Sequence, residues 1–157
     1  MIYKSFLVEN NINVLKNKLI LFYGENLGLI NEFKKKIIDQ NKQTHILRFT
    51  QEEILKNEDN FLNELYNTSL FKNQKIFFVY DANDKISKLI TNILPNIGEN
   101  KIFLFSDVLE KKSKLRNFFE KEKTTDIIPC YTDNEISIKK IISNSLKEFG
   151  GVSQQIL

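Results

Sequence analysis

The chain has 157 residues, of which 41% are hydrophobic and 27% charged, a composition typical of one globular domain with a core. Its longest apolar runs, such as 76–80, are too short to cross a bilayer, and asparagines interrupt the early apolar stretch where a signal peptide would lie. The net charge of +3 is too small for a dedicated nucleic-acid binder. We therefore expect a cytoplasmic protein.

The single cysteine and the single histidine argue against several kinds of site. Cys130 cannot form an internal disulfide, which agrees with a reducing compartment, and we expect it to be a buried strand residue. His45 lies in an alternating stretch, 44–49, that is typical of a strand. A zinc site or a Ser-His-Asp triad needs more ligands or a better-placed partner. We expect no metal, cofactor or catalytic residue.

Short apolar runs alternate with helical patterns along the chain. The predicted strands are residues 19–23, 45–49, 76–80, 102–105 and 126–130, and they are apolar on both faces, as in a covered parallel sheet. Apolar residues with helical spacing fall in 30–38, 61–65, 86–97, 115–119 and 138–149. This alternation predicts an α/β fold with a parallel sheet and helices on both faces.

The last predicted helix begins near Asp133, a plausible N-cap, and Gly150 and Gly151 are expected to end it. Residues 152–157 then have the pattern of another helix that has only begun. We therefore expect one domain over 1–149. Residues 150–157 would begin a linker or second helical domain in a chain trimmed from a longer protein.

A glycine loop follows the first strand, in the position of a P-loop. It consists of Gly24, Glu25, Asn26, Leu27 and Gly28. A working P-loop, G-x-x-x-x-G-K-[ST], holds phosphates with backbone N–H groups and a lysine, and Mg²⁺ with a hydroxyl. Here the glycines are one residue too close, and Leu29, Ile30 and Asn31 replace the second glycine, the lysine and the hydroxyl residue. The loop therefore predicts no nucleotide hydrolysis, and a weak nucleotide site stays open.

Several segments, taken in order, resemble the delta subunit of bacterial DNA polymerase III. They are LFYGENLGLI (21–30), LNELYNTSLF (62–71), KIFFVYDAND (75–84), LEKKSKLR (109–116) and IPCYTDNE (128–135). The resemblance covers nearly the whole chain, although the surface is unusually rich in lysine and asparagine. It implies an AAA+ or RecA-like domain with a degenerate P-loop and no ATPase activity, in a subunit of the DNA-directed DNA polymerase holoenzyme.

The resemblance also implies partners. The protein would join tau or gamma subunits and delta-prime in a pentameric clamp loader, through a C-terminal domain beyond residue 157. It would bind the ring-shaped beta sliding clamp and open it for loading onto primed DNA during replication. The resemblance assigns clamp binding to Ser69, Leu70 and Phe71, with Lys72 beside them.

The residues themselves give separate support to this assignment. Leu70 and Phe71 are two large apolar side chains in a polar helix-to-strand connection, which suggests an interface anchor. Full burial of each contributes about 1.5–3 kcal/mol. The alternative is that they fill the core of the domain itself. Lys72 and Lys75 flank the pair and either assist docking or are merely solvated.

Two basic runs are candidates for contact with DNA phosphates in the assembled loader, or else form solvated surface. They are Lys34, Lys35 and Lys36, and then Lys111, Lys112, Lys114 and Arg116. Any DNA binding by this chain alone should be weak.

Rival functions are a nucleotide hydrolase with an aberrant loop, a different clamp- or DNA-binding adaptor, and a receiver-like signalling domain. The last needs an acidic pocket, for which Asp81, Asp84 and Asp107 offer a loose match.

Overall fold

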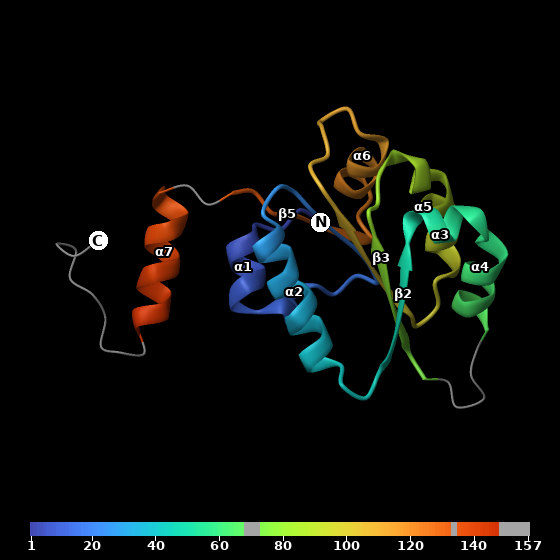
Figure 1. Ribbon diagram of the computed structural model, residues 1–157, viewed down its shortest axis with the longest axis horizontal. Helices are drawn as coiled ribbons and strands as arrows, with labels where there is room; N and C mark the ends of the chain where they lie inside the picture. The colour runs from blue at the N-terminus through green and yellow to red at the C-terminus, as the bar shows by residue number, and fades with distance from the viewer. Residues whose placement is uncertain (68–72, 133–134, 148–157) are drawn as a thin grey trace.

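Five parallel strands form the centre of the molecule. In the computed structural model, which describes residues 1–67, 73–132 and 135–147, the strands pair in the order β2-β3-β4-β1-β5 (Figure 1). Their bounds are β1 Leu19–Tyr23, β2 His45–Thr50, β3 Lys75–Tyr80, β4 Lys101–Ser106 and β5 Thr125–Pro129. All five predicted strands are confirmed to within one residue at each end. The α/β fold class is also confirmed, and the arrangement is consistent with an AAA+ or RecA-like domain.

Helix α1 precedes the first strand, and each strand is followed by one or two helices. The helices are α1 Ser5–Asn10, α2 Leu27–Gln40, α3 Gln51–Lys56, α4 Glu58–Tyr66, α5 Ser87–Ile93, α6 Lys114–Lys121 and α7 Glu135–Leu146, with 3-10 turns η1 Ile12–Val14, η2 Asp84–Ile86 and η3 Leu94–Asn96. The stripe predicted over 86–97 is divided among η2, α5 and η3. Asp133 and residues 148–157 lie outside the described residues.

Helices α1 and α3 were not among the predicted elements, because six residues are too few to display a helical period. A signal for α3 is nevertheless present. The Thr50 hydroxyl accepts a hydrogen bond from the Glu53 N–H, and the Glu53 carboxylate accepts one from the Thr50 N–H. This capping box is readable as T-x-x-E in the sequence.

The sheet has a hydrophobic core on each face. Side chains of β1 alternate between the two cores: Leu19 and Leu21 pack on one face, and Ile20 and Phe22 on the other. Helices α3 to α6 cover the first face, while α1, η1 and α2 cover the second (Figure 1). Both faces are therefore covered over β1, β3, β4 and β5, as their apolar runs predicted, whereas the edge strand β2 has no fully buried residue.

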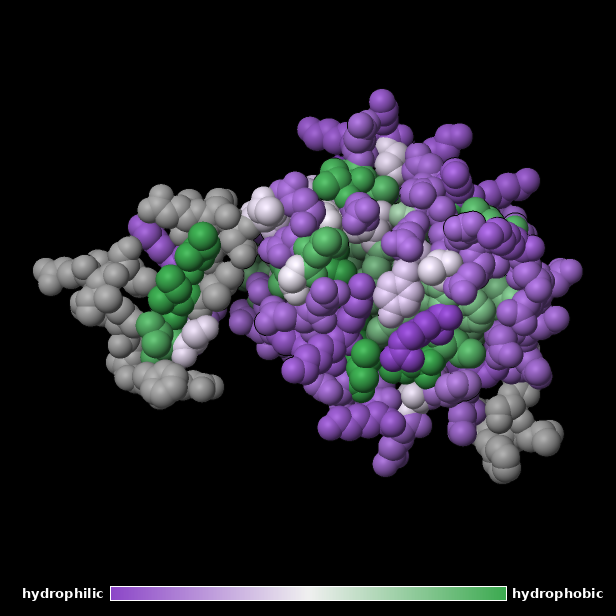
Figure 2. Space-filling view, in the orientation of Figure 1, coloured by the Kyte–Doolittle hydropathy of each residue, from purple (hydrophilic) through white to green (hydrophobic). Residues whose placement is uncertain are grey.

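Helix α7 differs from the other helices. In Figure 1 it lies apart from the layers that cover the sheet. Its Ile138 and Ile142 are 46% and 39% exposed, and Figure 2 shows a hydrophobic stripe along the helix. None of the helices in the described parts of the chain has the length and apolar character needed to span a membrane.

The turn after β1 brings two backbone segments unusually close together. Gly24 has φ of +139°, and a Cβ atom there would lie 2.0 Å from the carbonyl oxygen of Cys130. The Cys130 N–H donates to the Tyr23 carbonyl at 2.7 Å, and the Gly24 N–H faces the carbonyl oxygens of Ser106 and Asp107 at 3.3 and 3.2 Å. Only glycine fits this position, because any side chain would collide with backbone.

Gly24→Ala should therefore lower the free energy of unfolding by about 3 kcal/mol, since it combines backbone strain with a collision. Gly98→Ala is the matched control. Gly98 also has a positive φ, +64°, but a Cβ there would meet no atom within 4 Å. Its cost should be only about 1 kcal/mol. Urea unfolding of both variants checks the difference, and equal losses would contradict the close approach at Gly24.

Candidate functional site

The connection between α4 and β3 carries the predicted anchor. Its residues 68–72, and so Ser69, Leu70, Phe71 and Lys72, lie outside the described residues. Both flanks of the connection are described: Asn67 is the C-cap of α4, and Asn73 and Gln74 lead into β3. Because β3 begins here, the connection starts and finishes at the amino edge of the sheet, where the parallel strands begin.

Lys75 ties the end of α4 to the start of β3. Its Nζ donates to the carbonyl oxygens of Glu64 and Asn67, at 2.9 and 3.3 Å, and pairs with the Glu64 carboxylate at 3.4 Å. A cation at a helix C-terminus stabilises the unpaired carbonyls and the dipole of the last turn. The Lys75 side chain is only 16% exposed. Its position fits this capping role better than the predicted role in docking.

Asn100, just before β4, makes a second tie at the same edge. Its Nδ2 donates to the Leu65 carbonyl at 2.9 Å, and its Oδ1 accepts from the Lys75 N–H at 3.0 Å. The Gln74 side chain donates to the Glu99 carbonyl at 2.9 Å. These bonds fix both flanks of the 68–72 connection against the loop before β4. No local pattern predicts these bonds, because the partners come from three separate segments.

Helix α4 is anchored in the core under this connection. Phe61 is fully buried, with its ring edge-on to Phe49 and Phe77 at centroid distances of 5.5 and 5.7 Å. Leu65 is also buried, and Leu62 packs partly against the same core. The prediction that these residues hold the helix against the sheet is confirmed. The connection therefore leaves from a firmly packed helix.

The glycine loop lies at the opposite, carboxyl edge, and its amide donors are largely occupied. The Asn26 side chain caps α2 by accepting from the Leu29 N–H at 3.1 Å, and the Asn26 carbonyl accepts from the Ile30 N–H at 3.1 Å. The Leu27 N–H donates to the Glu25 carbonyl at 3.0 Å. In a working P-loop such amides cradle phosphate. Here the chain's own oxygens take that place.

The segment after β5 closes over the same loop. The Asn26 N–H donates to the Cys130 carbonyl at 3.1 Å, and its Nδ2 to the Tyr131 carbonyl at 3.3 Å. The Glu25 carboxylate accepts from both the hydroxyl and the N–H of Thr132, and these bonds lower the pKa of Glu25. A negative charge is thus held within the glycine loop. The loop's geometry supports the reading of a degenerate P-loop.

Cys130 and His45 occupy unremarkable positions. Cys130 follows β5 directly and is fully buried, as predicted. Burial, and to a smaller extent the negative charge of Glu9, raises the pKa of its thiol to about 12. His45 begins β2 and is exposed. Within 1–67, 73–132 and 135–147, no three His, Cys, Asp or Glu residues are grouped so that they could hold a metal ion.

Of the acidic residues considered for a signalling pocket, Asp84 serves local structure. Burial acts to raise the pKa of Asp84, but hydrogen bonds from the Ser113 hydroxyl and the Leu115 N–H lower it overall. The carboxylate thereby joins η2 to the start of α6. Asp81 has a φ of +56° just after β3. This arrangement gives no support to the receiver-like alternative.

The second basic run divides into two parts. Lys111, Lys112 and Lys114 are exposed at the carboxyl edge, and Lys112 pairs with Glu110 at 3.1 Å. Arg116 instead pairs through Nε with Glu120 at 2.7 Å, and its guanidinium lies 5.2 Å from the centre of the Tyr23 ring. Contact with DNA stays a prediction for the lysines, whereas Arg116 is already engaged within the domain.

The first basic run is also partly engaged. Lys34 lies over the rings of Tyr80 and Phe105, at 4.8 and 4.7 Å, and burial lowers its pKa. Lys36 donates to the Glu9 carbonyl at 2.8 Å. Lys35 is the exposed member of the run. One lysine of three is thus well placed for an outside phosphate.

Comparisons with known proteins give one family match and a structural similarity. The sequence matches the family model described as DNA polymerase III, delta subunit, over residues 20–131. The structure is similar to the Bacillus subtilis DNA clamp loader delta protein, with a TM-score of 0.68 and 15% sequence identity over 92% of this chain. The chain spans 47% of that protein, about half its length. A search of curated proteins gives no significant match.

The family match covers more than half of the chain and includes the glycine loop, α4 and the 68–72 connection. The structural similarity agrees with it at the level of the fold. The chain therefore belongs to the DNA polymerase III delta subunit family.

Proposed function

We propose that this chain is the clamp-binding part of a clamp-loader delta subunit. It would bind the beta sliding clamp through Leu70 and Phe71, assisted by Ser69 and Lys72, at the amino edge of the sheet. The observation that carries the proposal is the family match across residues 20–131, which contain this connection. The hydrogen bonds that fix Asn67 and Lys75 on either side of the connection support it, because a segment whose ends are fixed has less freedom to lose on binding.

Clamp opening would follow from differential binding. A ligand shifts a conformational equilibrium only by its preference for one of the two states. The anchor would fill a pocket of the clamp, and the packed end of α4 behind it would favour the open clamp interface. No nucleotide chemistry is needed in this chain for such a step. Assembly with tau or gamma and delta-prime, and contact with primed DNA in the replisome, would belong to the whole protein in its complex.

The proposal predicts that Leu70→Ala combined with Phe71→Ala raises the Kd for a cognate clamp at least about 100-fold. Two side chains that each contribute about 1.5–3 kcal/mol on burial account for this loss. Thermal stability should stay nearly unchanged. Surface plasmon resonance measures the affinity, and a thermal melt reports on folding.

A matched control is Phe6→Ala combined with Leu7→Ala, which removes an adjacent apolar pair that is 40% and 45% exposed on α1. This control should bind the clamp like the unmodified chain. Normal binding by a folded Leu70/Phe71 variant would refute the assignment of the anchor.

Lys75→Met should weaken clamp binding several-fold without touching the anchor itself. Methionine retains the apolar stem but cannot donate to the Glu64 and Asn67 carbonyls, so the anchor would sample more conformations before binding. The loss should vanish when the variant is made in the Leu70/Phe71 double-alanine background. An undiminished affinity in Lys75→Met would show that the tie does not position the anchor.

The alternative function, a nucleotide hydrolase with an aberrant loop, gives the opposite result in a simple assay. The chain incubated with Mg-ATP should release no phosphate above the rate in buffer, because the loop lacks the lysine and its amides face the chain's own oxygens. A phosphate-release assay checks this. Turnover that scales with protein concentration would favour the alternative.

A further inference from the structure

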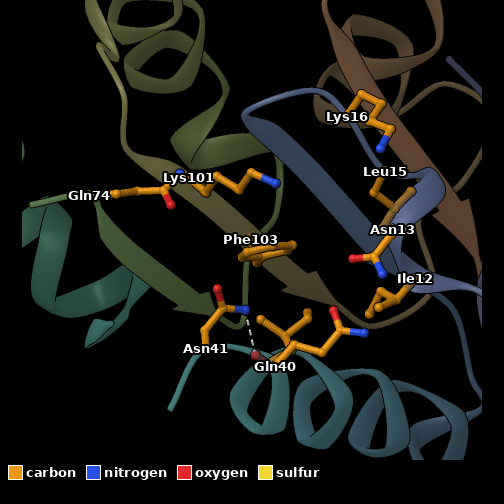
Figure 3. Close-up of a pocket in the computed structure, with 10 residues that line it drawn as sticks. Ile12, Asn13, Leu15, Lys16, Gln40, Asn41, Gln74, Lys101 and Phe103 are labelled. Atoms are coloured by element: carbon orange, nitrogen blue, oxygen red, sulfur yellow. Dashed lines mark hydrogen bonds between the residues drawn. The ribbon is translucent and has the colours of Figure 1, made fainter. Parts of the chain in front are cut away.

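A cavity of about 480 Å³ opens at the amino edge of the sheet, on the face covered by α2 (Figure 3). It lies between the end of α2, the residues around η1 and the start of β4. Apolar side chains, among them Phe103, form its inner wall, and side-chain amides of asparagine and glutamine line the rest together with two lysines, Lys16 and Lys101. We call it the amino-edge cavity.

The charges around the amino-edge cavity are of one sign. Among the described residues that line it there is no carboxylate. Figure 3 shows the two lysine side chains on different segments: Lys16 comes from the loop between η1 and β1, and Lys101 is the first residue of β4. Within the described residues neither lysine forms an ion pair, in contrast to Lys18 and Lys75, which pair with Glu99 and Glu64. The cavity therefore has a positive potential that favours an anionic group.

The amides add hydrogen-bonding capacity suited to a peptide. Carboxamides both donate and accept, so they can bind carboxylates as well as backbone groups. The Asn41 Nδ2 already donates to the Ile37 carbonyl at 2.7 Å, which fixes that side chain at the rim. The apolar wall around Phe103 would exclude water behind a bound group.

The position of the cavity indicates the kind of ligand. Small ligands of open α/β sheets bind at the carboxyl ends of the strands, and this cavity lies at the amino ends. It is lined by Gln74, which follows the 68–72 connection by two residues. A protein that docked on Leu70 and Phe71 would therefore stand at the same edge of the sheet as the cavity.

We infer that the amino-edge cavity accepts an acidic segment of the same protein that binds Leu70 and Phe71, with Lys16 and Lys101 pairing with its carboxylates. This second contact rests on the proposed function and extends it. Charged pairs at the rim of an interface mainly accelerate association and fix register, and their effect falls with salt.

The test compares clamp binding by the unmodified 157-residue chain with that of Lys16→Glu combined with Lys101→Glu. At low salt the variant should associate about 10-fold more slowly, and the dependence of its Kd on salt should be shallower. The matched control is Lys85→Glu combined with Lys88→Glu, which makes the same change of charge at exposed residues outside the cavity. The control should associate less than 2-fold more slowly.

The outcomes separate the two claims. The Lys16/Lys101 variant and the control could associate with the clamp at the same rate, while the Leu70/Phe71 double-alanine variant does not bind. The proposed second contact would then be refuted, and the assignment of the anchor would be retained. If the unmodified chain does not bind a cognate clamp, the proposed function fails, and this inference fails with it. Competition with clamp binding by millimolar deoxynucleoside monophosphate, lost in the Lys16/Lys101 variant, would assign the cavity to a small phosphate ligand and overturn the inference. Should the glutamate variant not fold, Lys16→Gln with Lys101→Gln gives the same comparison.

Discussion

The parallel direction of all five strands is the constraint on which the rest of the structure depends. Because every strand starts at one edge and finishes at the other, the loops fall into two groups separated by the length of the sheet. The glycine loop and the exposed lysines 111, 112 and 114 lie at the carboxyl edge. The 68–72 connection and the amino-edge cavity lie at the other. Two different surfaces are thus available to two different partners.

The carboxyl edge has the layout of a nucleotide site but is closed by the chain itself. The decisive feature is the backbone approach of Gly24 to Cys130, which brings the segment after β5 against the loop. That approach places Thr132 beside Glu25 and lets Asn26 bond to Tyr131. The loop can keep this shape without a bound ligand, since the chain's own oxygens satisfy its amides.

The amino edge is organised by polar side chains between covalently distant loops. Lys75 and Asn100 satisfy the last carbonyls of α4, so a helix end that would otherwise need water is tied to the sheet. In the same region, Lys16 and Lys101 have no carboxylate partner within the part of the chain that the structure describes. The proposed binding of a partner at this edge draws on both features, the fixed helix end and these two lysines.

The amino-acid sequence by itself determined the strands, the longer helices, the α/β class and the defects of the glycine loop, because each is a local pattern of apolar spacing or residue type. It also identified the family through short motifs such as YGENLGLI. Only the tertiary structure decided that Lys75 caps a helix, that Arg116 is held by Glu120 and Tyr23, and that Lys16 and Lys101 share a cavity. These facts depend on residues brought together by the order of the strands in the sheet, and no local period in the sequence encodes such distances.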